Sequence, residues 1–332
     1  SDHRLSKNVH KHDYDHKKLN RFLPLQGLVI RFLSFRLIDF LYLNHENISE
    51  VFLKLASEDT NFKLLRPIFK WNHIETNSNG SLFTVKLKDK TELNIKTKLI
   101  VGADGIASHV SKSFGFTRMT YRYERALAIL FSSEYILDAE NNLKTYITDQ
   151  GIVAMIPRAG GGCKIGLTIN RKDVRLWKQL SNPERSKKIS DLVPEYKDLE
   201  VNFGGIYPPT MINTNKWVKN NLVLIGDACH GLHPGRSQGM NTSIKCIDQL
   251  IEILPPKVGF KSAEISKSLK CYQETIKPKI DSILGKNHKI GLQMDKFNEL
   301  TETEEINKYK ELEQNVDNAY KYRMNSAGYG NN

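Results

Sequence analysis

The chain has 332 residues, 39% of them hydrophobic and only 11 of them proline, which suits one or two globular domains and excludes fibrous and disordered classes. The formal net charge is +12, but the lysines are dispersed, a pattern typical of a solvated basic surface rather than of a nucleic-acid site. The four cysteines include no C-x-x-C pair and no signal peptide is recognisable, so we expect a cytoplasmic protein.

The start of the chain is first polar and then apolar. Residues 1–20 have no hydrophobic period, which indicates a loop, and their histidines lack the spacing of a metal site. Residues 23–43 lack the run of about 20 apolar residues that a membrane-spanning helix needs. Charged residues interrupt the stretch at Arg31, Arg36 and Asp39. Peripheral membrane contact stays open for this stretch.

A helix is predicted at residues 47–55. Asn47 and Glu50 form an N-x-x-E capping pair, so the helix is expected to begin near Asn47. Apolar residues recur at intervals of three and four, which predicts that one face of the helix is buried, formed by Ile48, Val51, Phe52 and Leu55.

Strands are predicted from Asn72 onward, where apolar and polar residues alternate. Residues 82–87, a turn at 88–90 and a second strand through Ile95 predict a β-hairpin. An antiparallel sheet is then expected from four strands, at residues 126–131, 144–148, 152–156 and 164–170.

Helices are predicted in the second half of the chain. Residues 177–192, interrupted near Pro183, are expected to cover one face of the antiparallel sheet. A strand-to-helix unit follows at residues 221–254, and residues 262–318 have the pattern of charged amphipathic helices.

The first candidate site is the sequence LIVGADGIASHV at residues 99–110. A buried strand delivers Asp104 and Gly105 to a turn that opens a helix, and Ser108 can cap or line that turn. Two interpretations stay open here. The strand end is a ligand site, or it is a tight loop in which glycine permits positive φ and aspartate bonds its own backbone.

The second candidate site lies within residues 221–254, where Gly226 and Asp227 end a strand. A carboxylate at such a position can accept hydrogen bonds from sugar hydroxyls. We expect a helix from Ser237, whose free N–H groups and dipole stabilise negative charge, and Gly239 lets a planar ligand approach its backbone. Its apolar positions are predicted to bury one face: Met240, Ile244, Ile247, Ile251 and Leu254.

The two motifs resemble those of the class A FAD-dependent monooxygenases, the para-hydroxybenzoate hydroxylase-like aromatic hydroxylases. GADGIAS resembles the family's Asp-Gly motif, GDACHGLHPGRSQGMN resembles its Gly-Asp motif, and residues 268–281 are similar to its C-terminal helix. The resemblance covers about residues 40–290. It implies that the two strand ends, at residues 102–103 and 226–227, are neighbours in one sheet.

The fold implied by the resemblance is a mixed α/β (α+β) fold. An incomplete Rossmann-like FAD-binding domain is expected to carry an inserted antiparallel substrate sheet and C-terminal helices. The expected divisions are a partial FAD-binding domain at residues 1–120, a substrate-binding sheet at 121–215, and a return to the FAD-binding domain with C-terminal helices at 216–332.

The chemistry implied by the resemblance needs FAD as cofactor, NAD(P)H as reductant and O2, and it hydroxylates an aromatic or polyketide-like small molecule. Asp227, after Gly226, would hold ribityl or ribose hydroxyls of FAD, and Asp104 and Gly105 would lie near the pyrophosphate. The isoalloxazine ring would lie beside Pro234, Gly239, Met240 and Asn241. No catalytic side chain is assigned.

Several residues depart from the family pattern. Residues 1–40 contain one glycine, so the G-x-G-x-x-G turn that opens the family is missing, and we expect a fragment, a split gene product or an incomplete form of a longer enzyme. Single positions also differ, with Ser237 in place of the usual glycine, Cys246 in place of aspartate and Ser111 where arginine often follows the Asp-Gly motif.

Alternatives for function stay open. A flavin-dependent epoxidase or reductase of an isoprenoid lipid would use the apolar residues 23–43 to guide a lipophilic substrate. A truncated, non-catalytic paralogue would bind a partner or an anionic surface without flavin. His230 and His233 are either general bases or polar loop residues packed near the cofactor. The sequence predicts no oligomeric state.

Overall fold

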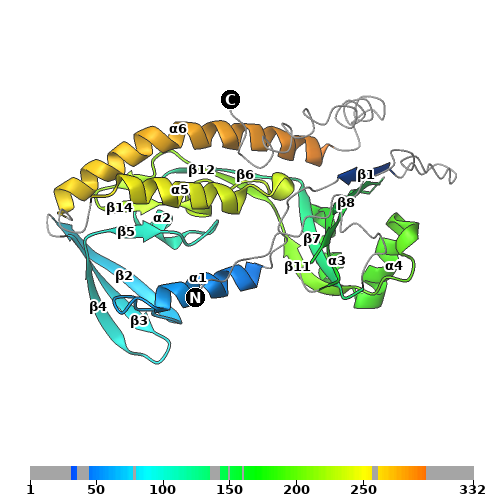
Figure 1. Cartoon of the computed structure of the whole chain (residues 1–332), viewed down its shortest axis with the longest axis horizontal. Coiled ribbons are helices and arrows are strands. Elements are labelled where there is room, and N and C mark those ends of the chain that lie inside the picture. Colours follow the sequence, from blue (N-terminus) through cyan, green and yellow to red (C-terminus); the bar gives the residue numbers. More distant parts are fainter. Residues whose placement is uncertain are drawn as a thin grey trace, which may run out of the picture.

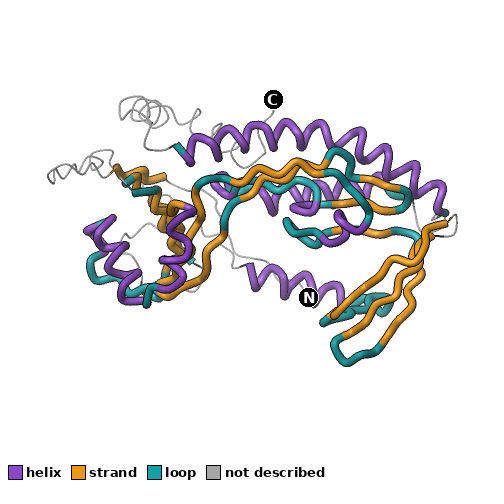
Figure 2. Tube along the Cα trace, turned by 180° about the vertical axis from the view of Figure 1, so that it is seen from behind, coloured by secondary structure: helices purple, strands orange, loops and turns teal. Residues whose placement is uncertain are grey.

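The computed structural model describes residues 31–35, 45–77, 80–134, 143–148, 150–158, 161–255 and 261–296. Two sheets lie at opposite ends of an elongated molecule, and the helices α5 (Gly239–Ile253) and α6 (Ser262–Asp295) run along one side of it (Figure 1). Seen from behind, strands that lie between the two end sheets run alongside α6 (Figure 2). Within the ranges above, no helix combines the length and the hydropathy that crossing a membrane requires.

A small central sheet joins distant parts of the chain. β5 (Ile100–Gly102) and β14 (Leu222–Leu224) pair in parallel, and β13 (Val218–Lys219) pairs antiparallel with β14. This sheet and α6 share one hydrophobic core, whose buried members include Trp217, Leu222, Leu269 and Tyr272. The predicted strand-to-helix unit after residue 221 is therefore confirmed.

A three-stranded antiparallel sheet forms one end of the molecule. Its strands are β2 (Ile68–Asn77), β3 (Gly80–Leu87) and β4 (Glu92–Thr97). The β3–β4 pair is the predicted hairpin, and its turn places Lys90 in the left-handed region at φ 72°. Asn221 ties this sheet to the central one, because its side chain accepts a hydrogen bond from Ser81 and donates one to the Lys98 carbonyl, each at 3.0 Å.

A six-stranded sheet forms the other end, in the order β1-β8-β9-β10-β7-β11, and each neighbouring pair is antiparallel. The strands are β1 (Arg31–Phe35), β7 (Arg125–Ser132), β8 (Leu143–Ile147), β9 (Ile152–Pro157), β10 (Cys163–Asn170) and β11 (Asn202–Tyr207). The antiparallel sheet expected from four strands is therefore confirmed, and β1 and β11 extend it.

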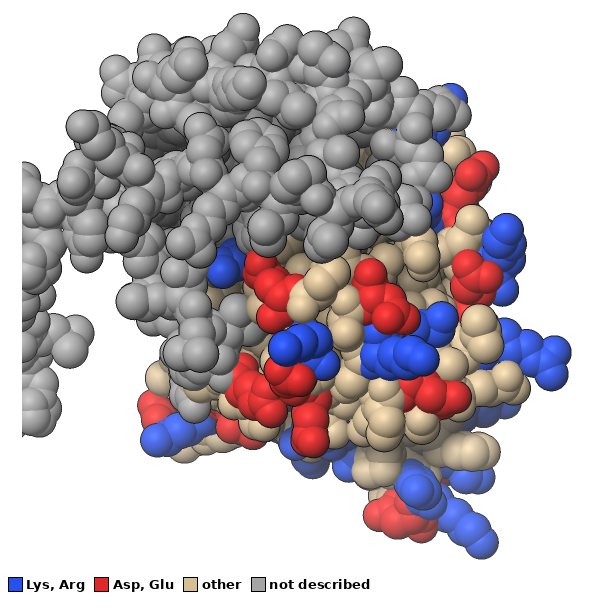
Figure 3. Space-filling view, turned by 90° about the vertical axis from the view of Figure 1, so that its right-hand side faces the viewer, with Lys and Arg blue, Asp and Glu red and all other residues tan. Residues whose placement is uncertain are grey.

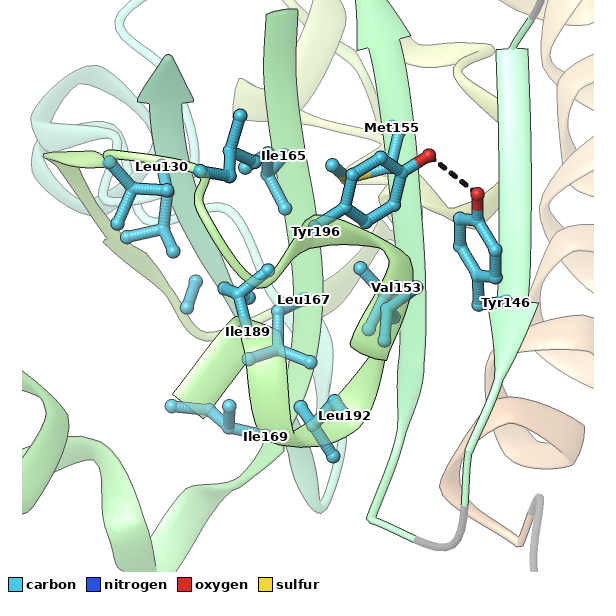
Figure 4. Close-up of a cluster of buried hydrophobic side chains, with 14 of the residues drawn as sticks. Leu130, Tyr146, Val153, Met155, Ile165, Leu167, Ile169, Ile189, Leu192 and Tyr196 are labelled. Atoms are coloured by element: carbon cyan, nitrogen blue, oxygen red, sulfur yellow. Dashed lines mark hydrogen bonds between the residues drawn. The ribbon is translucent and has the colours of Figure 1, made fainter. Parts of the chain in front are cut away.

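Two helices cover one face of the six-stranded sheet, α3 (Val174–Gln179) and α4 (Asn182–Leu192). Ser181 and Glu184 form a capping box at the start of α4, so the break predicted near Pro183 is the start of a second helix. Side chains from these helices and the sheet pack into a core in which the hydroxyls of Tyr146 and Tyr196 are hydrogen-bonded (Figure 4).

A strand pair connects the two ends of the molecule. β6 (Arg118–Arg122) and β12 (Thr210–Thr214) pair antiparallel, and Tyr123, Met211 and Leu284 of α6 form a small buried cluster beside them. The remaining elements are short: the helix α2 (His109–Ser113) and the 3-10 turns η1 (Arg171–Asp173), η2 (Pro194–Tyr196), η3 (Gly226–Ala228) and η4 (Pro234–Arg236).

The helix α1 (His45–Ser57) forms where a helix was predicted, but its predicted cap and buried face are wrong. The helix begins at His45, so Asn47 lies inside the first turn. The predicted face is largely exposed, at 56% for Val51, 59% for Phe52 and 55% for Leu55. Figure 1 shows the reason, because α1 lies apart from the described sheets that could cover this face.

The predicted buried face of α5 is also wrong. Thr242, Cys246 and Leu250 are the buried residues of this helix, which packs against α6 and η3. Of the five apolar positions on which the prediction rested, Leu254 packs against the core of the central sheet, and the other four are exposed to between 39% and 65%, at Met240, Ile244, Ile247 and Ile251. The row of α5 that is buried therefore includes the polar Thr242 and is not the most apolar row of the helix.

Charged side chains of both signs are interspersed on the face that Figure 3 shows, which is the end of the molecule that carries α3 and α4. On this face Lys and Arg do not gather into a separate basic patch (Figure 3). This mixture agrees with the expectation that the net charge of +12 is spread over a solvated surface.

Two glycines of α6 provide a test of its packing. A Cβ on Gly291 would lie 2.3 Å from the buried ring of Tyr123, whereas a Cβ on Gly285 meets no atom within 4 Å. Gly291→Ala should therefore lower the free energy of unfolding by about 1–3 kcal/mol through overpacking. Gly285→Ala should raise it by about 0.5–1 kcal/mol, because alanine favours the helix. Urea denaturation of both variants measures this, and shifts of the same sign would contradict the packing described.

Candidate functional site

The two predicted motifs meet at one edge of the central sheet. Leu224 pairs with Gly102 across the parallel strands, and the Ile225 N–H donates to the Gly102 carbonyl at 2.9 Å. A Cβ on Gly102 would lie 2.6 Å from the Leu224 side chain, so a larger residue there would have to displace that side chain. The predicted adjacency of the strand ends is confirmed, and both loops leave the sheet at its carboxyl edge.

The carboxylate of Asp104 is engaged by the protein itself. It accepts hydrogen bonds from Ser108 Oγ at 2.5 Å and from the N–H groups of His109 and Val110 at 2.6 and 3.0 Å, which caps α2. Partial burial alone would raise the pKa of Asp104, but these hydrogen bonds outweigh burial and hold the pKa below its usual value. This contact supports the loop interpretation for the Asp104 side chain. Gly105, at φ 75°, has open space on its Cβ side.

The carboxylate of Asp227 has a different environment. Gly226 adopts φ 60° and brings the chain close to α5, since a Cβ there would lie 3.0 Å from Ser243 Oγ. Asp227 is exposed between buried neighbours, and in the described part of the chain its side chain forms no hydrogen bond. Partial burial of the carboxyl raises its pKa. A carboxylate that lacks a protein partner suits hydroxyl donors of a ligand.

The loop between Asp227 and α5 contains two buried histidines. Burial lowers the pKa of His230 and of His233 to about 4, so both are neutral at pH 7. The His230 ring lies 5.2 Å from the Trp217 ring, and its Nε2 lies 3.6 Å from Cys246 Sγ. His233 Nδ1 accepts a hydrogen bond from the Gly235 N–H at 3.1 Å. Their packing favours the interpretation as loop residues over that as general bases.

The N-terminus of α5 is open. The helix begins at Gly239, two residues later than predicted, because Ser237 takes the left-handed conformation at φ 51°. A Cβ on Gly239 would meet no atom within 4 Å. Among the described residues, the N–H groups of the first turn have no hydrogen-bond partner at Gly239, Met240 and Asn241. These free donors fit the anionic or planar group that was predicted to bind here.

Comparison with known sequences identifies the family. The pattern of the FAD binding domain family matches residues 71–256, which is more than half of the chain. This chain belongs to that family, whose cofactor is FAD. The free carboxylate of Asp227 and the open turn at Gly239 fit such a cofactor, because its ribityl chain offers hydroxyl donors and its ring is flat.

Relatives of known name share part of this chain. Ubiquinone hydroxylase UbiL from Rhodospirillum rubrum is 28% identical over 165 residues, which cover 48% of this chain and 38% of that protein. Digeranylgeranylglycerophospholipid reductase 2 from Methanopyrus kandleri is 23% identical over 222 residues, which cover 64% of this chain and 54% of that protein. The chain therefore spans only part of the length of these relatives.

Solved structures share the fold. The structure of PqsL, a probable FAD-dependent monooxygenase from Pseudomonas aeruginosa, has a TM-score of 0.59 at 19% identity, and the match covers 75% of this chain and 70% of that chain. The likeness supports the mixed α/β fold predicted from the sequence.

Two polar residues of α6, which were not predicted from the sequence, hold backbone groups of other elements, at the loop before α5 and at the start of β7. Asn287 is fully buried and bonds the His233 backbone, and Asp295 accepts hydrogen bonds from the backbone at Glu124 and Arg125. One signal was present, because Asn287 interrupts the buried row of α6 that contains Ile276, Ile280, Leu284 and Gly291. A polar residue within an apolar row indicates a buried polar contact.

The cap formed by Asp104 can be tested through stability. Asp104→Ala should lower the free energy of unfolding at pH 7 by about 0.5–1 kcal/mol, the lower end for a helix cap, because the side chain is exposed. Since the folded-state pKa of Asp104 is lowered, its contribution is present above the unfolded-state pKa and is lost as pH falls through the folded-state value. Urea titrations of both proteins at several pH values check this, and a penalty that grows toward acid pH would contradict it.

Proposed function

We propose that this chain is part of an FAD-dependent monooxygenase that hydroxylates an aromatic ring carrying a lipophilic tail. NAD(P)H is the proposed reductant and O2 the second substrate. The observation that carries the proposal is the pairing, at one sheet edge, of the unpartnered Asp227 carboxylate with the open N-terminus of α5. One relative is named a ubiquinone hydroxylase, and that name supports the choice of substrate class.

The residues of this chain would hold and tune the cofactor. Asp227 would accept hydrogen bonds from ribityl or ribose hydroxyls, and Gly239 would admit the ring to the end of α5. The helix dipole there would stabilise negative charge on the reduced ring by about 0.3–2 kcal/mol. When bound, FAD supplies the redox chemistry with NAD(P)H and O2. His230 and His233 are neutral at pH 7, so neither would act as a general acid through an imidazolium form.

The six-stranded sheet supports a lipophilic substrate. Ala126, Ala128 and Leu130 of β7 pack into the core beneath α3 and α4. Successive side chains of a strand point to opposite faces, so the residues between them lie on the other face of the sheet, at Leu127, Ile129 and Phe131. β10 lies between β7 and β9 and adds Lys164, Gly166 and Thr168 to this face, and the alternate residues of β9 are again apolar, at Ile152, Ala154 and Ile156. The apolar residues that β7 and β9 place on this face suit contact with a prenyl tail.

A second candidate is reduction of an isoprenoid lipid, which the digeranylgeranylglycerophospholipid reductase relative favours. Product analysis separates the two. The visible absorbance of the purified chain measures the amount of flavin that it binds. The chain is then incubated with NAD(P)H, O2 and a prenylated phenol. A product with one added oxygen atom supports the hydroxylase, and a product with added hydrogen supports the reductase. A folded, colourless protein that binds no added FAD would support a non-catalytic binding protein.

The role of Asp227 is tested by FAD titration. Asp227→Ala removes charged hydrogen bonds worth about 1.5–3 kcal/mol, so the Kd for FAD should rise by about tenfold to more than a hundredfold. The fold should stay intact, because no described residue bonds this carboxylate. Asp248→Ala, which removes the same charge from an exposed position of α5, is the matched control and should leave the Kd unchanged. Equal affinities for wild type and Asp227→Ala would refute the assignment.

The open space at Gly239 gives a steric test. Because a Cβ there meets no protein atom within 4 Å, Gly239→Ala should leave the midpoint of urea unfolding unchanged or slightly higher. Gly239→Val fills the space further, and FAD binding should fall from wild type through alanine to valine. Fluorescence titration with FAD measures the series. Unaltered binding by Gly239→Val would show that the ring does not approach this turn.

A further inference from the structure

Asn287 is the one buried amide in the apolar row of α6 described above. Its exposed fraction is 0%, and its neighbours in the row include Leu284 at 2%. Burying an amide without hydrogen bonds costs about 1–3 kcal/mol in proteins. The side chain therefore needs a specific partner, and the partner lies outside the helix.

The partner is the backbone of a single residue, His233. The His233 N–H donates to Asn287 Oδ1 at 2.7 Å, and Asn287 Nδ2 donates to the His233 carbonyl at 2.9 Å. The two hydrogen bonds hold the two peptide groups on either side of the His233 Cα, and so fix the position and the orientation of the backbone at this residue. Pro234, the next residue, begins η4, which leads into the open turn of α5.

Neighbouring residues of α6 complete the contact with this loop. His288 Nδ1 lies 2.9 Å from the Tyr123 hydroxyl, and the Tyr123 ring packs edge-on against the His233 ring at 4.6 Å. Gly235 lies close to Met294, because a Cβ added to this glycine would clash with Met294 Sδ. The loop is therefore enclosed between α6 and Tyr123.

The same turns of α6 also hold the start of the six-stranded sheet. The Asp295 carboxylate accepts hydrogen bonds from the backbone N–H groups of Glu124 and Arg125, at 2.9 and 3.0 Å, and β7 begins at Arg125. Asn287 and Asp295 are eight residues apart, about 12 Å along one helix. One rigid element thus contacts both the proposed flavin loop and the proposed substrate sheet.

We propose that Asn287 is a positioning residue, whose two hydrogen bonds to His233 hold the loop of residues 233–236 in the place where Pro234 flanks the flavin ring. The flavin part of this inference rests on the proposed function. The hold on the loop itself does not, and the two parts have separate readouts.

The hold on the loop is measured without flavin, by hydrogen–deuterium exchange of the purified chain. Asn287→Ala should speed amide exchange in a peptide spanning residues 231–238 on the order of tenfold. Leu269→Ala is the matched control, because Leu269 is equally buried in α6 but lies about 27 Å away along the helix. It should lower overall stability without a selective effect on this peptide. Equal exchange in wild type and Asn287→Ala, or the same selective change in Leu269→Ala, would overturn the proposal.

The flavin part is measured by the visible spectrum and the Kd of added FAD. Asn287→Asp is nearly isosteric: its ionised form can accept from the His233 N–H but cannot donate to the His233 carbonyl, whereas its protonated form can do both. Burial raises the pKa of such a carboxyl, so lowering the pH from about 8 to about 5.5 should return the spectrum and Kd toward wild type. Asn287→Ala should show a weaker Kd, on the order of tenfold, at every pH.

Wild-type protein at the same pH values controls for the other titratable groups around the loop, which are His233, His288, Tyr123 and Asp295. A spectrum and Kd of Asn287→Ala equal to wild type at every pH would refute the positioning role at the flavin. If the wild-type chain binds no FAD, the proposed function fails, and the exchange experiment still decides whether Asn287 holds the loop.

Discussion

The parallel pairing of β5 with β14 is the contact on which the site depends. It joins segments about 120 residues apart, and it places both of their loops at the carboxyl edge of one sheet. Gly102 allows the close approach, and Asn221 locks the entry of β14, since its backbone carbonyl accepts from Ile100 and its side chain bonds both Ser81 and Lys98. Asn221 therefore anchors the β2–β4 sheet to the central sheet at the end of the strands opposite to the site.

The two aspartates at this edge have opposite environments, although each follows a strand in a similar motif. The Asp104 carboxylate accepts hydrogen bonds from Ser108 and from the first N–H groups of α2, and these bonds lower its pKa. Asp227 bonds no described residue, and partial burial raises its pKa. The hydrogen-bonding positions of the Asp104 carboxylate are occupied by groups of the protein and stabilise the fold. The Asp227 carboxylate is positioned by its loop but forms no hydrogen bond with a described residue. The two motifs thus combine one structural carboxylate with one that suits a ligand.

Sequence patterns predicted local structure better than they predicted partners. The β3–β4 hairpin, the antiparallel sheet and the adjacency of the two strand ends follow from alternation, turn residues and the family resemblance, and each is confirmed. The buried faces of α1 and α5 were wrong, because periodicity shows that a face is apolar without showing what covers it. In α5 the buried row contains Cys246, a smaller side chain than those in the exposed row. Asn287 was missed because its partner is a backbone group 54 residues away.

The shape of α6 determines how the two halves of the molecule are held together. Its first half packs Ile265, Leu269 and Tyr272 into the core of the central sheet, and its last turns contact the loop at His233 and the start of β7. Pro278 lies between the halves and removes one helical hydrogen bond, which accounts for the curvature of α6 in Figure 1. Asn287 and Asp295 both follow this proline, so one continuous segment of α6 contacts the loop at His233 and the start of β7, and the two contacts are held about 12 Å apart along that helix.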